Sequence, residues 1–150
     1  MGKAIVHPEF NSCLGKNKIV KFPPAKKLVA RELKAAQDDL KAAGESLKGD
    51  REKWATVQAY YAMFHTARAL LYFKGYREKS HYCLIVAMKA LFVAEGLLDV
   101  TLVEAFGMAK VLRENADYDN EYSKDSAKSL VDKAKKFFLA GKKILESKSS

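Results

Sequence analysis

The chain has 150 residues and a mass of 16.8 kDa, a size that fits one domain around one hydrophobic core and excludes a multidomain enzyme. Hydrophobic residues make up 49% of it and charged residues 30%, which excludes a disordered or fibrous protein. The longest stretch without an acidic or basic side chain, residues 54–67, is too short to cross a bilayer, so we expect no membrane partner. The first residues lack the apolar run of a secretory signal, and we therefore expect a cytoplasmic protein.

The net charge of +9 is concentrated at the two ends of the chain. Residues 1–34 carry eight Lys or Arg against two Glu, and residues 123–150 carry eight Lys against three acidic residues, whereas the middle is slightly acidic. Two basic ends could attract the phosphates of a nucleic acid. They could equally be solvated helix faces that keep the protein in solution, and the sequence leaves both interpretations open.

The first regular element is predicted only after residue 22. Residues 1–22 contain scattered Lys, Gly, Asn and Ser without a repeating apolar pattern, which predicts a flexible basic arm. From residue 25 to residue 47, apolar residues recur every three or four positions, a spacing typical of a helix with one buried side. Residues 54–73 are apolar on nearly every side of a second helix, which indicates a central or interfacial position.

Three more helices are predicted in the second half of the chain. Ser80 can cap a helix that ends at Gly96, Thr101 begins another, and the last runs from Ser123 to residue 145.

No segment alternates apolar and polar residues for long enough to predict a strand, and short connections favour antiparallel neighbours. The sequence therefore predicts an all-α fold, an antiparallel up-and-down bundle of four main helices plus one short helix. We place this bundle at residues 23–146 and a C-terminal tail at residues 147–150.

Polar side chains cross the second predicted helix at intervals of four, three and four residues, at Tyr61, His65, Arg68 and Tyr72. At this spacing they share one side of the helix. Because a buried His or Arg is costly without a partner, some group has to pair with them. One interpretation is an internal network with tyrosine hydroxyls and carboxylates such as Asp117. The other is a pocket in which Arg68 binds a phosphate and the tyrosines stack on a base.

Two further segments carry candidate phosphate-binding residues. His81 stands in the first turn of the third predicted helix, near Arg77, where unpaired backbone N–H groups favour an anion. An ordinary solvated turn is the alternative there. Arg113, Asp117 and Tyr118 lie where the fourth predicted helix ends, and a salt bridge to Asp117 is the structural alternative at that site.

The two cysteines do not indicate a site. Cys13 and Cys83 are too few and too isolated for a disulfide framework or a metal knuckle, and we expect Cys83 to fill the core. No phosphate-binding glycine loop, hydrolase elbow, zinc-binding helix or EF-hand loop is present. We therefore expect no metal and no cofactor.

A family resemblance rests on three runs, which are YYAMFHTARALL at residues 60–71, GYREKSH at residues 75–81 and RENADY at residues 113–118. In this order and separation they resemble the small stand-alone prokaryotic branch of the HEPN domain family (higher eukaryotes and prokaryotes nucleotide-binding). The resemblance covers about residues 20–146. It implies a helical bundle that pairs as a homodimer and has a minimal nucleotidyltransferase as its partner in toxin–antitoxin-like modules. Many family members are metal-independent ribonucleases whose motif is Arg, four to six residues, then His.

In this chain Tyr118 stands where that motif has His, and a phenol is a poor general base at neutral pH. The leading hypothesis is a nucleotide- or RNA-binding HEPN module that lacks the full ribonuclease motif and works with a nucleotidyltransferase. One alternative is a metal-independent ribonuclease toxin, with His65 and His81 as catalytic candidates. The other is a purely structural dimerisation module. The candidate nucleotide- or phosphate-binding residues are Tyr61, His65, Arg68, Arg77, His81, Arg113, Asp117 and Tyr118.

Overall fold

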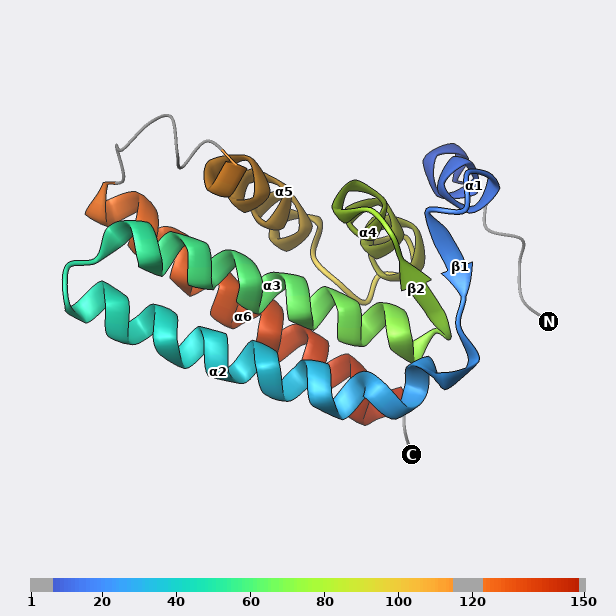
Figure 1. Cartoon of the computed structure of the whole chain (residues 1–150), viewed down its shortest axis with the longest axis horizontal. Coiled ribbons are helices and arrows are strands. Elements are labelled where there is room, and N and C mark those ends of the chain that lie inside the picture. The colour runs from blue at the N-terminus through green and yellow to red at the C-terminus, as the bar shows by residue number, and fades with distance from the viewer. Residues whose placement is uncertain (1–6, 115–122, 149–150) are drawn as a thin grey trace.

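A computed structural model describes residues 7–114 and 123–148, and these form a bundle of helices with one two-stranded sheet at one end (Figure 1). The three longest helices pack along one another and are α2 (Val29–Lys48), α3 (Glu52–Phe73) and α6 (Lys124–Lys148). Two further helices, α4 (His81–Met88) and α5 (Val100–Glu114), pack on α3 from another side. Helix α3 is therefore the centre of the bundle.

Successive long helices run in opposite directions. In Figure 1, α2 and α3 are antiparallel neighbours, and so are α5 and α6. The short helical turn η1 (Pro23–Leu28) leads into α2, and the π-helical turn η2 (Lys89–Val93) extends α4. The predicted all-α, antiparallel up-and-down bundle is confirmed. Within the described ranges, no helix is both long enough and apolar enough to span a membrane.

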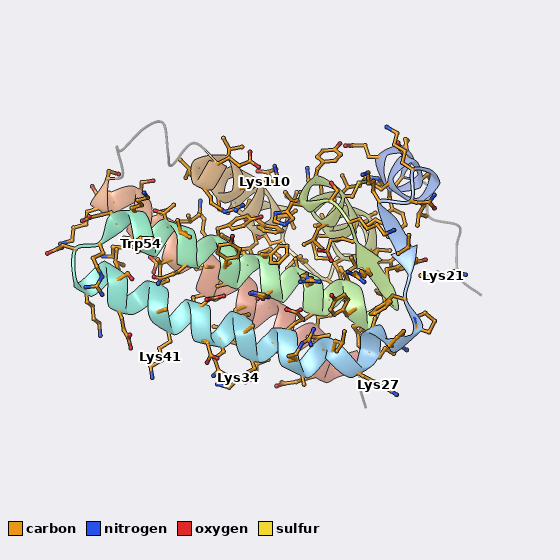
Figure 2. All side chains as sticks on the ribbon, viewed as in Figure 1. Lys21, Lys27, Lys34, Lys41, Trp54 and Lys110 are labelled. Atoms are coloured by element: carbon orange, nitrogen blue, oxygen red, sulfur yellow. A yellow bond between two sulfur atoms is a disulfide. The ribbon has the colours of Figure 1, made fainter. Side chains whose placement is uncertain are left out.

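The pattern of side chains explains why α3 takes the central position. Thirteen of its residues are buried and they lie on every side of the helix, as expected for a helix surrounded by others. Gly141 of α6 allows a close approach to α3, because a Cβ at this position would lie 2.6 Å from the Thr66 side chain. The outer side of α2 is hydrophilic, and Figure 2 shows Lys34 and Lys41 pointing away from the bundle there.

Part of the N-terminal segment is folded, which corrects the expectation of an arm over residues 1–22. Helix α1 (Pro8–Gly15) precedes strand β1 (Ile19–Lys21), and β1 pairs antiparallel with β2 (Tyr76–Glu78). Each strand has three residues, too few for an alternating pattern to stand out in the sequence, so the expectation of no sheet was wrong. Phe10 and Ile19 are both only 1% exposed, so this segment belongs to the core.

Cys13 and Cys83 form a disulfide, which corrects the expectation that they are unpaired and that Cys83 only fills the core. The bond joins α1 to the first turn of α4, and its Cα atoms are 5.9 Å apart. The two cysteines are 70 residues apart in the sequence, so their pairing depends on the tertiary fold and has no local signal.

Candidate functional site

Two groups of polar and aromatic side chains lie along α3. The first, which we name the carboxylate cluster, surrounds Arg68 and consists of Glu32, Asp39, His65, Arg68, Tyr72 and Glu78. The second, which we name the Arg113 cluster, lies nearer the start of α3 and consists of Tyr60, Tyr61, Phe64, His81, Lys110 and Arg113. Helices α2, α4 and α5 and strand β2 each bring one or more of these residues to α3.

In the carboxylate cluster, Arg68 is held from three directions. Its Nε lies 3.2 Å from Glu78 Oε1 and its Nη1 lies 3.6 Å from Glu32 Oε1. Its Nη2 donates a hydrogen bond to the Tyr72 hydroxyl. The contact with Glu78 is an ion pair without hydrogen-bond alignment, because neither of its two atoms has a hydrogen bond among the described residues. The guanidinium is therefore neutralised within the fold.

The two carboxylates beside Arg68 are both buried but respond to burial differently. Burial alone would raise the pKa of Glu32, but the hydrogen bond from His65 and the charge of Arg68 outweigh it, so this pKa is lowered. At Glu78 burial dominates and raises the pKa, although Arg68 opposes the shift. The fold thus favours the charged form of Glu32 and disfavours the charged form of Glu78.

Both ring nitrogens of His65 face carboxylates. Its Nδ1 lies 2.6 Å from Glu32 Oε2, and its Nε2 lies 3.6 Å from Asp39 Oδ2. These contacts agree with the interpretation of His65 and Arg68 as parts of an internal network. The carboxylates are Glu32 and Glu78, whereas the sequence had suggested Asp117. Glu32 had a signal in the sequence, since it interrupts the apolar side of its helix between Val29 and Leu33. Glu78 had none.

In the Arg113 cluster, the arginine rests on aromatic rings. The Arg113 guanidinium carbon is 5.3 Å from the centre of the Tyr60 ring and 5.2 Å from that of Tyr61, distances typical of cation–π contacts. Among the described residues, no carboxylate lies within 4.0 Å of its nitrogens. The neighbouring Lys110 differs, because its Nζ lies 2.6 Å from Glu114 Oε1.

His81 joins this cluster from the start of α4. Its Nδ1 lies 2.5 Å from the hydroxyl of Tyr60, and its ring packs on Phe64 with 4.6 Å between ring centres. Burial and the positive charges of Arg113, Lys110 and Arg68 lower the pKa of His81. Burial also raises the pKa of Tyr60 far above its usual value. At neutral pH, His81 is therefore uncharged and Tyr60 keeps its proton.

Phe64 connects the two clusters. The Arg68 guanidinium carbon lies 5.3 Å from the centre of its ring, and His81 packs on the same ring. Tyr61 also spans the gap, since its ring centre is 6.5 Å from that of His65. The polar side of α3 is thus continuous, but its C-terminal part is neutralised and its N-terminal part carries the charge of Arg113.

The remaining predicted site residues lie elsewhere. Arg77 is exposed on β2 and packs over Phe22 at 5.5 Å, so the structure does not bring it to either cluster. Asp117 and Tyr118 lie outside the described residues. In the ranges that the structure describes, no group of three or more His, Cys, Asp and Glu side chains is arranged to hold a metal ion.

The chain belongs to the HEPN family, because the model of the HEPN domain matches residues 29–145. The match spans α2 to α6 and therefore includes both clusters. Similar proteins have been described in archaea and bacteria. Two proteins of Methanocaldococcus jannaschii, each named "putative toxin", are 30% identical to this chain; the alignments cover 83% and 76% of it and 86% of each relative. A UPF0332 protein of Thermotoga maritima is 28% identical, over 80% of this chain and 92% of the relative. The family predicted from the three sequence runs is confirmed.

Proposed function

We propose that this HEPN domain binds the phosphate of a nucleotide or RNA through Arg113 and His81. The observation that carries the proposal is the contrast between the two arginines on the polar side of α3. Arg68 lies between Glu32 and Glu78, whereas the guanidinium of Arg113 lies over two tyrosine rings. A guanidinium that lies over a ring keeps its positive charge, and its N–H groups can still donate hydrogen bonds to an anion.

The surroundings of Arg113 support an anion as the ligand. Lys110 adds a second positive charge on the same helix, while Glu114 offsets part of it. The half-exposed imidazole of His81 supplies a polar edge next to Arg113, and Tyr61 supplies an aromatic ring beside it. Cation, imidazole and aromatic ring are the groups that proteins use for a phosphate with an attached base.

Titration of ATP, GTP and a short single-stranded RNA against Arg113→Ala tests the proposal. We expect wild type to bind at least one of the three and the variant to bind it at least about tenfold more weakly, since a hydrogen bond to a charged group contributes about 1.5–3 kcal/mol. The matched control is Lys128→Ala, which removes one charge from the exposed side of α6. Absence of binding by wild type, or equal losses in both variants, would overturn the proposal.

As a second part of the proposal, the protein is one member of a toxin–antitoxin-like pair, in the cytoplasm, with a minimal nucleotidyltransferase as the other member. The names of two relatives support the toxin-like role. Co-expression with a nucleotidyltransferase encoded beside its gene should give a complex that co-elutes on size exclusion and relieves a growth defect caused by this chain alone. Separate elution together with unchanged growth would contradict the pairing.

We also propose a homodimer. Met108 and Val111 of α5 are 65% and 52% exposed, although both are large apolar residues, and exposed apolar side chains of one element favour association. Sedimentation equilibrium should show a dimer at micromolar concentration, and Met108→Lys together with Val111→Lys should shift it to monomer. A monomeric wild type would remove this part of the proposal.

A ribonuclease is the second candidate function, and the relatives named as toxins favour it. His81 is the better placed of the two candidate histidines, because carboxylates face both nitrogens of His65. Purified protein incubated with RNA and EDTA should then cleave it, and His81→Ala should abolish the cleavage. Equal cleavage by the variant would identify a contaminant. If neither binding nor cleavage is found, the structural dimerisation module is the function that remains.

A further inference from the structure

We infer that Tyr60 fixes which nitrogen of His81 carries the proton, so that His81 meets a bound phosphate as a neutral hydrogen-bond donor through Nε2. This inference rests on the proposed phosphate site and adds Tyr60 to it. Tyr60 acts on the ligand only through His81, which makes it a positioning residue.

The first step concerns the proton of the Tyr60 hydroxyl. Tyr60 has no exposed surface, and its hydroxyl oxygen lies 2.5 Å from His81 Nδ1. Among the described residues, His81 Nδ1 is the one acceptor within hydrogen-bond distance of this hydroxyl. Arg113 also lies beside Tyr60, but a guanidinium has no lone pair to accept with. Because a buried O–H without an acceptor is costly, the hydroxyl donates to Nδ1.

The second step concerns the charge of the imidazole. Burial disfavours a proton on both nitrogens, and so do the charges of Arg113 and Lys110 on α5 and of Arg68 on α3, whereas Glu114 favours it. The ring is therefore neutral and carries one proton. Since Nδ1 accepts from Tyr60, that proton is on Nε2.

The third step is that the ring is held in place while Nε2 stays available. Phe64 packs on the ring, and Ser80 caps α4 by accepting a hydrogen bond from the Cys83 N–H at 3.3 Å. His81 is thus fixed as the first residue of α4. The ring is partly exposed, and Nε2 has no hydrogen-bond partner among the described residues.

This arrangement gives His81 a definite chemical role. A neutral N–H donates to a phosphate oxygen at any pH above the lowered pKa of the imidazole, without first taking up a proton. The same tautomer has no lone pair at Nε2, so His81 cannot act there as the base that removes a 2′-hydroxyl proton. The inference therefore favours binding over cleavage at this residue.

Nitrogen-15 NMR of the histidine rings in the ligand-free protein at pH 7 tests the tautomer directly. We expect His81 to show a protonated Nε2 and an unprotonated Nδ1, and we expect Tyr60→Phe to produce a mixture of both tautomers. A protonated Nδ1 in wild type overturns the inference even if the variant does not fold.

Ligand titration then links Tyr60 to the phosphate. With ATP or RNA as the probe, Tyr60→Phe should weaken binding about three- to tenfold, whereas Tyr82→Phe should leave it unchanged, because that hydroxyl on α4 bonds Glu9 and not His81. Unchanged tautomer and affinity in a folded Tyr60→Phe overturn the inference while the proposed function stands. No binding by wild type refutes the proposed function, and the tautomer measurement still decides the inference about Tyr60.

Discussion

Arg68 and Arg113 lie on the same polar side of α3 but are stabilised in different ways. Arg68 is surrounded by acidic groups from α2 and β2 and by a tyrosine hydroxyl. Arg113 lies on the rings of Tyr60 and Tyr61. Carboxylates cancel the charge of a guanidinium, whereas rings stabilise it and leave the charge in place. The partners of an arginine, and not its burial alone, therefore decide whether it stabilises the fold or can bind a ligand.

The disulfide gives the largest expected effect. It anchors α4, the helix that brings His81 to the Arg113 cluster. Replacing Cys13 and Cys83 together by Ala should lower the free energy of unfolding by about 4 kcal/mol, the loop-closure value for the 70-residue separation. Urea titration measures this change in the free energy of unfolding. Wild type under reducing conditions is the matched control and should lose a similar amount. An unchanged midpoint in both would show that α1 is held by packing alone.

Removal of each arginine tests the comparison itself. Arg68→Met should destabilise the protein by about 3 kcal/mol, because Glu32 and Glu78 would stay buried without a counter-charge. Arg113→Met should cost less than about 1 kcal/mol, the order of a cation–π contact. Equal decreases of the urea midpoint in the two variants would contradict this difference, because the two arginines would then have the same structural role.

The same small change at two carboxylates should have opposite effects. At pH 7, Glu32→Gln should destabilise the fold by about 2 kcal/mol, the contribution of one hydrogen bond to a charged group, whereas Glu78→Gln should leave stability unchanged or raise it. The pKa of Glu32 is lowered, so its contribution is present above the usual pKa of 4.5 and is lost as the pH falls below it.

The pKa of Glu78 is raised, so its protonated form stabilises the fold at low pH and this contribution is lost as the pH rises through the raised value. Urea midpoints of wild type and both variants between pH 3 and pH 7 give the two slopes, that of Glu32 below pH 4.5 and that of Glu78 above it. Parallel slopes for the variants would contradict the assignment of opposite shifts.

The helices were predictable because their signals are local. Apolar spacing predicted α2, all-round apolarity predicted the central α3, and Ser80 was correctly predicted as the cap of α4. Strands β1 and β2 were not predictable, because three residues are too few to show alternation and their pairing joins distant segments. The disulfide was missed for the same reason, since it depends on how α1 packs against α4.

The candidate site was predictable in its residue types but not in its pairing. The spacing of His65, Arg68 and Tyr72 placed them together on α3, and Arg68 does bond Tyr72. The carboxylates that neutralise Arg68 come from a neighbouring helix and from a strand that was not predicted, so no local pattern could reveal them. The division into a neutralised cluster and a charged cluster is therefore a property of the tertiary fold.

The segment from residue 78 to residue 81 has a mechanical consequence. Glu78 lies opposite Ile19 in the sheet, the Lys79 N–H bonds the Lys18 carbonyl oxygen at 2.8 Å, and Ser80 caps α4. The backbone between Glu78 and His81 is therefore held by strand pairing, by a backbone hydrogen bond and by the helix cap. Because this connection is short and hydrogen-bonded, we expect a displacement of His81 to be passed on to Glu78, the counter-ion of Arg68.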